Sequence, residues 1–341
     1  MANAPHETGT PAASRTAPAT SSPAERAVVF GAHRGLVGVV TYPTPVKATD
    51  ASAPPRRAVV MANIGLSHHV GPFRLYVDLA RAVAAMGWYA LRFDLSGLGD
   101  SLPRSGAKES GEQAMADVRE ALDWLEAQLG VREVVLVGLC SGVDSMHPVA
   151  VADARVIGAV FVDGYTYPTL GYHLRRHTLR YLQPERWRRF IARRMRRRAT
   201  PAIASMPAGE DPQQAVFQRE YPTRAQFRAE VAATVARGAR LLFVFTGTFD
   251  ASFNSERQMA EVLGRAVPRG TVDARVFPRA DHLFSAVSHR AAFFECVRKW
   301  LAGFPPAGSD AAPIVATRPA AVVPSTARGA GTALAAAVVR A

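Results

Sequence analysis

Short apolar runs alternate with amphipathic segments over most of the chain. Runs rich in Val, Ile, Leu and Phe, bounded by Gly, Pro or charged residues, are typical of strands in a buried sheet. They predict strands at 27–30, 36–42, 58–63, 88–93, 134–137, 156–162, 241–245 and 273–277. Between them apolar residues recur at helical spacing, which predicts helices at 73–86, 112–128, 143–152, 255–263 and 291–301.

The order of these elements predicts an α/β fold. The first two runs are separated only by G-A-H-R-G at 31–35, which favours a hairpin. The later strands alternate with helices, which is typical of a mostly parallel, doubly wound sheet covered on both faces. Residues 165–237 break this alternation with helical sequence alone, so we expect a helical cap inserted at the edge where such sheets bind ligands.

Composition divides the 341 residues into a core, an insertion and two tails. Hydrophobic residues make up 48% of the chain, which suffices for a large core, whereas both ends are rich in Ala, Pro, Ser and Thr and are predicted to be disordered. The expected division is a tail at 1–24, core at 25–164, an arginine-rich cap at 165–237, core at 238–304 and a tail at 305–341.

The two cysteines, Cys140 and Cys296, lie far apart and lack metal-ligand spacing. They therefore provide neither a disulfide framework nor a cysteine zinc site, and they suit a reducing compartment. The N-terminal sequence does not resemble a signal peptide, and no apolar run approaches the roughly 20 residues that span a bilayer. We expect a cytoplasmic protein.

Residues 132–142, R-E-V-V-L-V-G-L-C-S-G, form an apolar strand that enters a tight turn. In a nucleophile elbow the apex residue has a strained backbone, and the residues two before and two after it must be small. Gly138 and Gly142 meet this condition around Cys140, whereas Ser141 at the apex would be flanked by bulky residues. Cys140 is therefore the candidate nucleophile. The alternative is a buried structural cysteine in a strand-to-helix turn.

A thiol nucleophile needs a base, and the base needs an acid to orient it. Asp250 follows the strand predicted at 241–245, and His282 follows the last predicted strand. This gives the chain order nucleophile, acid, base. Asp163, which follows the strand at 156–162, is the alternative acid, and the adjacent Asp281 is expected to cap a helix instead.

Two backbone N–H groups are expected to stabilise the oxyanion that forms during attack on a carbonyl. One belongs to Ser141, the residue after the candidate nucleophile. The other is expected from Leu66 in N-I-G-L-S-H-H, where Gly65 allows the chain to turn. His68 and His69 extend this loop and are expected at the rim of the site as substrate-binding residues, with a catalytic role as the alternative.

These motifs together resemble the α/β-hydrolase superfamily, and within it the serine-aminopeptidase-like and monoacylglycerol-lipase-like branch. The resemblance extends over residues 27–303 except the cap, and it rests on N-I-G-L-S-H-H-V-G-P-F-R-L-Y, L-R-F-D-L-S-G-L-G-D-S, G-L-C-S-G, F-T-G-T-F-D and A-D-H-L-F-S. It implies Cys140 as nucleophile, His282 as base, Asp250 as acid, and Leu66 and Ser141 as oxyanion donors.

The chain departs from the pattern of that superfamily at its nucleophile, since most members carry serine where Cys140 stands. Dienelactone-hydrolase-like members also use cysteine, so this departure is compatible with activity. Asp94, Gly97 and Gly99 of the second motif are interpreted as structural.

The predicted cap contains eleven arginines and one acidic residue between positions 175 and 198. Three interpretations remain open. The arginines form a solvated face; or Arg193, Arg194 and Arg197 recognise the phosphates of a coenzyme A or acyl-carrier donor; or the face makes peripheral contact with an anionic membrane. The net charge of +13 is not accompanied by a nucleic-acid recognition module, so no specific nucleic-acid partner is expected.

The sequence thus predicts a hydrolase or acyltransferase that acts on a small-molecule ester or thioester through an acyl-cysteine intermediate. An esterase, a thioesterase and an acyltransferase all remain compatible with it, and this chemistry requires no cofactor and no metal. The alternative is a non-catalytic protein of the same fold whose basic cap binds an acidic partner.

Overall fold

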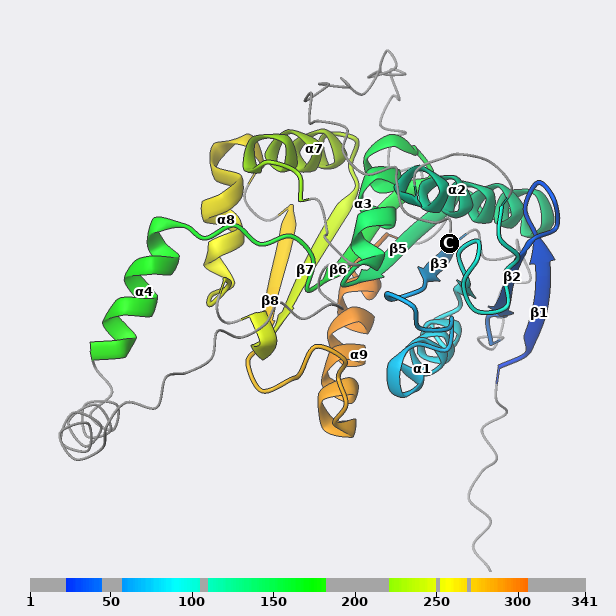
Figure 1. Ribbon diagram of the computed structural model, residues 1–341, viewed down its shortest axis with the longest axis horizontal. Coiled ribbons are helices and arrows are strands. Elements are labelled where there is room, and N and C mark those ends of the chain that lie inside the picture. Colours follow the sequence, from blue (N-terminus) through cyan, green and yellow to red (C-terminus); the bar gives the residue numbers. More distant parts are fainter. Residues whose placement is uncertain are drawn as a thin grey trace, which may run out of the picture.

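The computed structural model describes residues 23–44, 57–104, 110–181, 221–249, 252–268 and 271–305. A twisted sheet of eight strands forms the centre of this part of the chain (Figure 1). The strands are β1 (Glu25–Phe30), β2 (Leu36–Thr41), β3 (Arg57–Ala62), β4 (Tyr89–Phe93), β5 (Glu133–Leu139), β6 (Val156–Val162), β7 (Arg240–Thr246) and β8 (Val272–Phe277).

The order of the strands in the sheet is β1-β2-β4-β3-β5-β6-β7-β8. β1 and β2 form the predicted hairpin, and β2 pairs with β4 in the antiparallel sense. From β4 to β8 every neighbouring pair is parallel. The prediction of a mostly parallel sheet is confirmed, and the carboxyl ends of β3 to β8 consequently share one edge.

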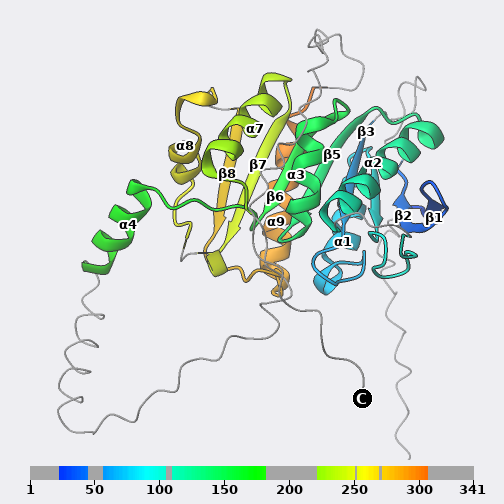
Figure 2. The same cartoon turned by 45° about the horizontal axis from the view of Figure 1, so that its top comes forward.

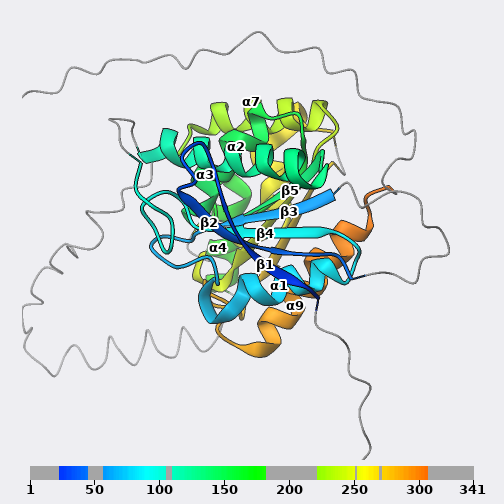
Figure 3. The same cartoon turned by 90° about the vertical axis from the view of Figure 1, so that its right-hand side faces the viewer.

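Helices cover both faces of the sheet, and Figure 3 shows them above and below the strands. The helices are α1 (Leu75–Ala84), α2 (Ser110–Leu129), α3 (Gly142–Ala152), α4 (Leu170–Tyr181), α7 (Arg224–Ala236), α8 (Arg257–Leu263) and α9 (Val287–Ala302), with short 3-10 turns at Pro72–Arg74, Gly247–Phe249 and Gly264–Ala266. α1 and α9 cover one face, and α2, α3 and α7 cover the other. Successive β3 residues alternate between the two cores, because Val60 packs with α2 and α3 whereas Val59 packs with α1 and α9.

Where the structure describes the segment predicted as a cap, 165–237, it contains the helices α4 and α7, and residues 165–169 and 221–223 before them are not helical. α4 projects beyond α8 at the end of the sheet (Figures 1 and 2). Arg175 of α4 forms an ion pair with Glu261 of α8, with 2.6 Å between nitrogen and oxygen. α7 lies on the sheet itself, where Phe227 is fully buried in the core. Residues 182–220, which include Arg193, Arg194 and Arg197, lie outside the described residues.

Among the helices that the structure describes, none combines the length and the apolar character that crossing a bilayer requires.

Candidate active site

Cys140 occupies the tight turn between β5 and α3, and its backbone has φ 54°. This left-handed conformation is unfavourable for a residue with a side chain, as expected at the apex of a nucleophile elbow. The flanking glycines are required by close backbone approach. A Cβ at Gly138 would lie 2.9 Å from the carbonyl oxygen of Gly142, and a Cβ at Gly142 would lie 3.0 Å from that of Asn63.

His282, in the loop between β8 and α9, is held by a buried carboxylate. Its Nδ1 lies 2.7 Å from Oδ2 of Asp163, a residue with no exposed surface at the carboxyl end of β6. Thr246 fixes the same carboxylate, because its N–H donates to Oδ1 at 2.8 Å and its hydroxyl donates to Oδ2 at 2.6 Å. The backbone N–H of His282 donates to Oγ1 of Thr248 at 3.0 Å. The imidazole orientation is therefore set from both its ring and its backbone.

The other side of the imidazole faces the candidate nucleophile, since the side chains of Cys140 and His282 are hydrogen-bonded. With Nδ1 committed to Asp163, the nitrogen that faces the sulfur is Nε2. Burial alone would lower the pKa of His282, but the hydrogen bonds to Asp163 and Cys140 and their negative charges raise it to about 9. A protonated imidazole and a thiolate at Cys140 therefore stabilise each other.

Backbone hydrogen bonds join the three strand ends that support this arrangement. The N–H of Cys140 donates to the carbonyl oxygen of Val162 at 2.9 Å, and the N–H of Asp163 donates to that of Val244 at 2.9 Å. The nucleophile and the carboxylate therefore leave adjacent strands, and their separation is fixed by sheet pairing and does not depend on loop conformation.

The acid expected from the chain order, Asp250, lies outside the described residues. The carboxylate that bonds His282 is Asp163, which the sequence had offered as the alternative. Both aspartates directly follow apolar strands, so their local sequence does not separate them. Asp281 does not cap a helix, because the N-cap residue of α9 is Ala286. Instead Asp281 stabilises the turn after β8: its carboxylate accepts from the N–H of Leu283 at 3.1 Å and from the hydroxyl of Ser285 at 2.6 Å.

The loop after β3 is tied to the elbow. The N–H of Gly65 donates to Oγ of Ser141 at 2.8 Å, and Gly65 has φ 52°, which is the turn expected there. Leu66 follows with a largely exposed side chain. This contact brings the loop that carries Leu66 next to Ser141, and the oxyanion role of the two backbone N–H groups stays a prediction.

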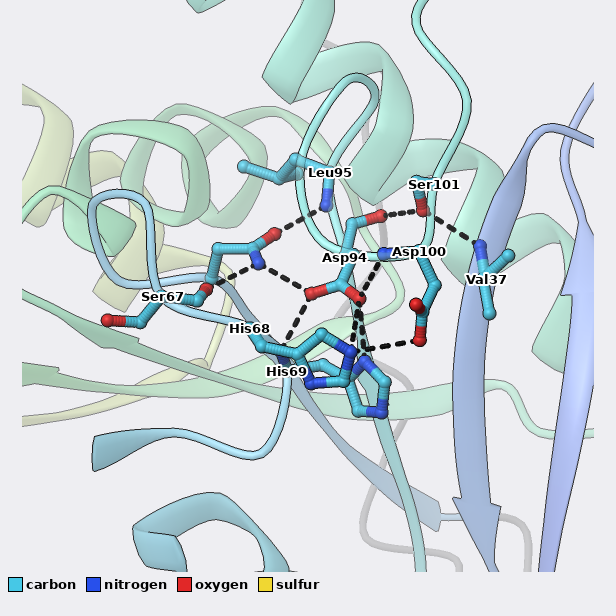
Figure 4. Close-up of polar contacts among 9 residues, drawn as sticks. Val37, Ser67, His68, His69, Asp94, Leu95, Asp100 and Ser101 are labelled. Atoms are coloured by element: carbon cyan, nitrogen blue, oxygen red, sulfur yellow. Dashed lines mark hydrogen bonds and ion pairs between the residues drawn. The ribbon is translucent and has the colours of Figure 1, made fainter. Parts of the chain in front are cut away.

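His68 and His69 contact two aspartates of the loop after β4 (Figure 4). His69 is 5% exposed, so it is buried and not at the expected rim, because its Nδ1 lies 2.7 Å from Oδ2 of the buried Asp94. His68 is partly exposed, and its Nε2 lies 2.9 Å from Oδ2 of Asp100.

Asp94 has the structural role that was expected. Burial would raise the pKa of this carboxyl, but hydrogen bonds from His69, the N–H of Asp100 and the amide of Asn63 lower it below its usual value. A Cβ at Gly99 would overlap the carboxylate of Asp94, which explains the glycine at that position.

The sequence was also compared with known proteins. No protein-family model matches it, and neither does any curated protein. Solved structures do match. An esterase from Pyrococcus furiosus superposes with a TM-score of 0.50 at 14% identity, covering 82% of this chain and 93% of the esterase. An esterase domain from Rhodothermus marinus superposes with a TM-score of 0.47 at 20% identity, covering 81% of this chain and 97% of that domain.

A third structure, an α/β serine hydrolase from Xanthomonas campestris, superposes with a TM-score of 0.45 at 16% identity, covering 84% of this chain and 98% of that protein. The strand order, the elbow and the match to the Pyrococcus esterase define the class of the fold: the chain has an α/β-hydrolase fold.

Cys140 is expected to alkylate faster than Cys296 at pH 7. The protonated His282 favours the reactive thiolate at Cys140, whereas burial raises the pKa of the Cys296 thiol. The Cys140 thiolate persists when the imidazolium loses its proton, so the advantage of Cys140 is largest at neutral pH. It shrinks only as the pH approaches the raised pKa of Cys296, where that thiol also ionises. Iodoacetamide labelling followed by peptide mass spectrometry measures both rates in one sample. Equal rates at pH 7 would contradict the ion pair.

Proposed function

We propose that the protein is a hydrolase of carboxylic esters or thioesters that works through an acyl-cysteine intermediate. Cys140 is the nucleophile, His282 the general base and acid, and Asp163 the acid that orients it. The observation that carries this proposal is the pairing of one imidazole with a buried carboxylate on one side and with an elbow cysteine on the other. The esterase activity named for the Pyrococcus structure of the same fold agrees with this class of substrate.

In the first half-reaction the Cys140 sulfur attacks the carbonyl carbon, and a C–S bond forms as the carbonyl oxygen takes the negative charge. The N–H groups of Ser141 and Leu66 stabilise that oxyanion. The tetrahedral intermediate collapses when the bond to the leaving group breaks, and Nε2–H of His282 gives its proton to the departing oxygen or sulfur. Asp163 keeps the other proton on Nδ1 throughout.

In the second half-reaction the now neutral His282 takes a proton from water, and the resulting hydroxide attacks the acyl carbon. The C–S bond breaks, the acid product leaves, and the thiolate–imidazolium pair is restored. An alcohol, amine or thiol in place of water would give acyl transfer through the same steps.

Trapping the intermediate tests the proposal directly. The full chain is mixed with a p-nitrophenyl ester of a short fatty acid and quenched in acid during the first turnovers. We expect intact-mass spectrometry to show one added acyl group, located by peptide mapping at Cys140 and released by neutral hydroxylamine, which cleaves thioesters readily. Cys296→Ala serves as the matched control, since it removes the other thiol and should still acylate.

Two results would count against the mechanism. Turnover with the acyl group on another residue would assign the nucleophile elsewhere. No acylation and no turnover with any ester or thioester would favour the alternative, a non-catalytic binding protein.

A further inference from the structure

Four metal-ligating side chains converge beside the oxyanion loop and take no part in the proposed acyl chemistry. His68 and His69 belong to the loop after β3, and Asp94 and Asp100 belong to the loop after β4. β3 and β4 are parallel neighbours, so these two loops meet at the same edge of the sheet. One ligand atom from each of the four side chains lies within 4.8 Å of the others.

The geometry of this cluster resembles a coordination sphere. His69 Nδ1 lies 2.7 Å and His68 Nε2 lies 3.4 Å from the same oxygen, Oδ2 of Asp94. The two imidazole rings lie side by side with centroids 3.8 Å apart, and one nitrogen of each ring faces the carboxylate of Asp94 (Figure 4). In a tetrahedral site with bonds of about 2.1 Å, ligand atoms lie roughly 3.4 Å apart. Small outward movements of these side chains would make room for an ion.

Hydrogen bonds from neighbouring groups already orient the carboxylate of Asp94, the most buried of the four side chains. Oδ1 of Asp94 accepts from the amide of Asn63 at 2.6 Å and from the backbone N–H of His69 at 2.7 Å. Metal ligands are typically oriented by such second contacts. An entry path exists as well, because the side chains of His68 and Asp100 are 40% and 61% exposed.

We propose that His68, His69, Asp94 and Asp100 bind one divalent transition-metal ion of the Zn²⁺ type. Two imidazole nitrogens and two carboxylate oxygens suit Zn²⁺ or Co²⁺, whereas Mg²⁺ and Ca²⁺ prefer oxygen ligands alone. The ion is structural: the acyl chemistry runs on Cys140 and His282, and the ion links the loop that carries Leu66 to the loop after β4.

The measurement uses the untagged full chain, freed of metal with a chelator and then dialysed. We expect Zn²⁺ titration followed by dialysis and elemental analysis to give one ion per chain. Co²⁺ should give the intense visible absorption of a four-coordinate site, and Mg²⁺ should not compete. None of these three measurements depends on turnover. They therefore test the metal site independently of the proposed esterase mechanism.

The variant His68→Ala/Asp100→Asn removes the two exposed ligands and leaves the buried hydrogen bonds of Asp94. We expect its Zn²⁺ affinity to fall by more than about 100-fold, since loss of a supporting contact alone costs up to about that much. The matched control, His33→Ala/Asp123→Asn, changes the same residue types at exposed positions outside the cluster and should bind as the wild type does.

Substoichiometric Zn²⁺ in the wild type would overturn the proposal, as would equal affinity in the cluster variant and the control. The cluster would then be a hydrogen-bonded histidine–aspartate network only. Because the wild-type stoichiometry and the Co²⁺ spectrum need no substitution, a folding defect in the variant would not remove the test.

Discussion

Replacement of Cys140 with alanine is expected to reduce ester turnover to roughly 10⁻⁴ of the wild-type rate or less, because loss of the nucleophile leaves only binding and the oxyanion donors. The elbow itself should survive, since alanine removes only the sulfur from a partly exposed side chain. Steady-state hydrolysis of a chromogenic ester, with circular dichroism to verify folding, measures the effect.

Cys140→Ser should fall between the wild type and Cys140→Ala. The hydroxyl occupies the same apex but is harder to deprotonate. Loss of the thiolate also removes one of the negative charges that raise the pKa of His282, so more of the imidazole is neutral and able to act as a base at pH 7. Cys296→Ala is the control and should keep full activity. Full activity in Cys140→Ala would eliminate the covalent mechanism.

Asp163→Asn is expected to lower kcat by about 10³- to 10⁴-fold, because an amide at this position favours the wrong imidazole tautomer and no longer stabilises the imidazolium. Asparagine fits the site sterically, and it tolerates the left-handed backbone of Asp163, which has φ 48°. The pKa of His282 should fall at the same time, since Asp163 contributes to its rise.

Asp250→Asn is the matched variant, with the same chemical change at the acid expected from chain order. It should retain close to wild-type activity, because Asp163 already occupies Nδ1 of His282. Comparing kcat, the pH–rate profile and the thermal midpoint for the two variants separates loss of the acid from loss of stability. A large loss in Asp250→Asn with a small one in Asp163→Asn would reverse the assignment.

The sequence predicts the elements well where apolar periodicity is strong and less well at their ends. The strand predicted at 134–137 extends over Glu133–Leu139, because Gly138 interrupts the apolar run although its backbone continues to pair with β6. The helix predicted at 291–301 begins at Val287, since its first turn, V-S-H-R, carries too few apolar residues to show the period.

The elbow could be predicted because the small residues it requires, Gly138 and Gly142, lie within two positions of Cys140 in the sequence. The partner of His282 could not, because Asp163 and Asp250 both follow apolar strands and only three-dimensional proximity distinguishes them. The histidine–aspartate cluster was missed for a related reason. His69 and Asp94 are separated in sequence by α1, and their contact depends on β3 and β4 being neighbours in the sheet.

The position of Asp163 directly after β6 leaves the segment after β7 free of the proposed acid. Cys140 and Asp163 follow adjacent strands that are linked by a backbone hydrogen bond, so two of the three proposed catalytic groups are positioned by the central sheet. Beyond Thr248, which still holds His282, the segment up to α8 carries none of the three groups. Positions of this segment that do not pack in the core, as Phe253 does against Phe245, can therefore vary while the charges of the proposed triad keep their places.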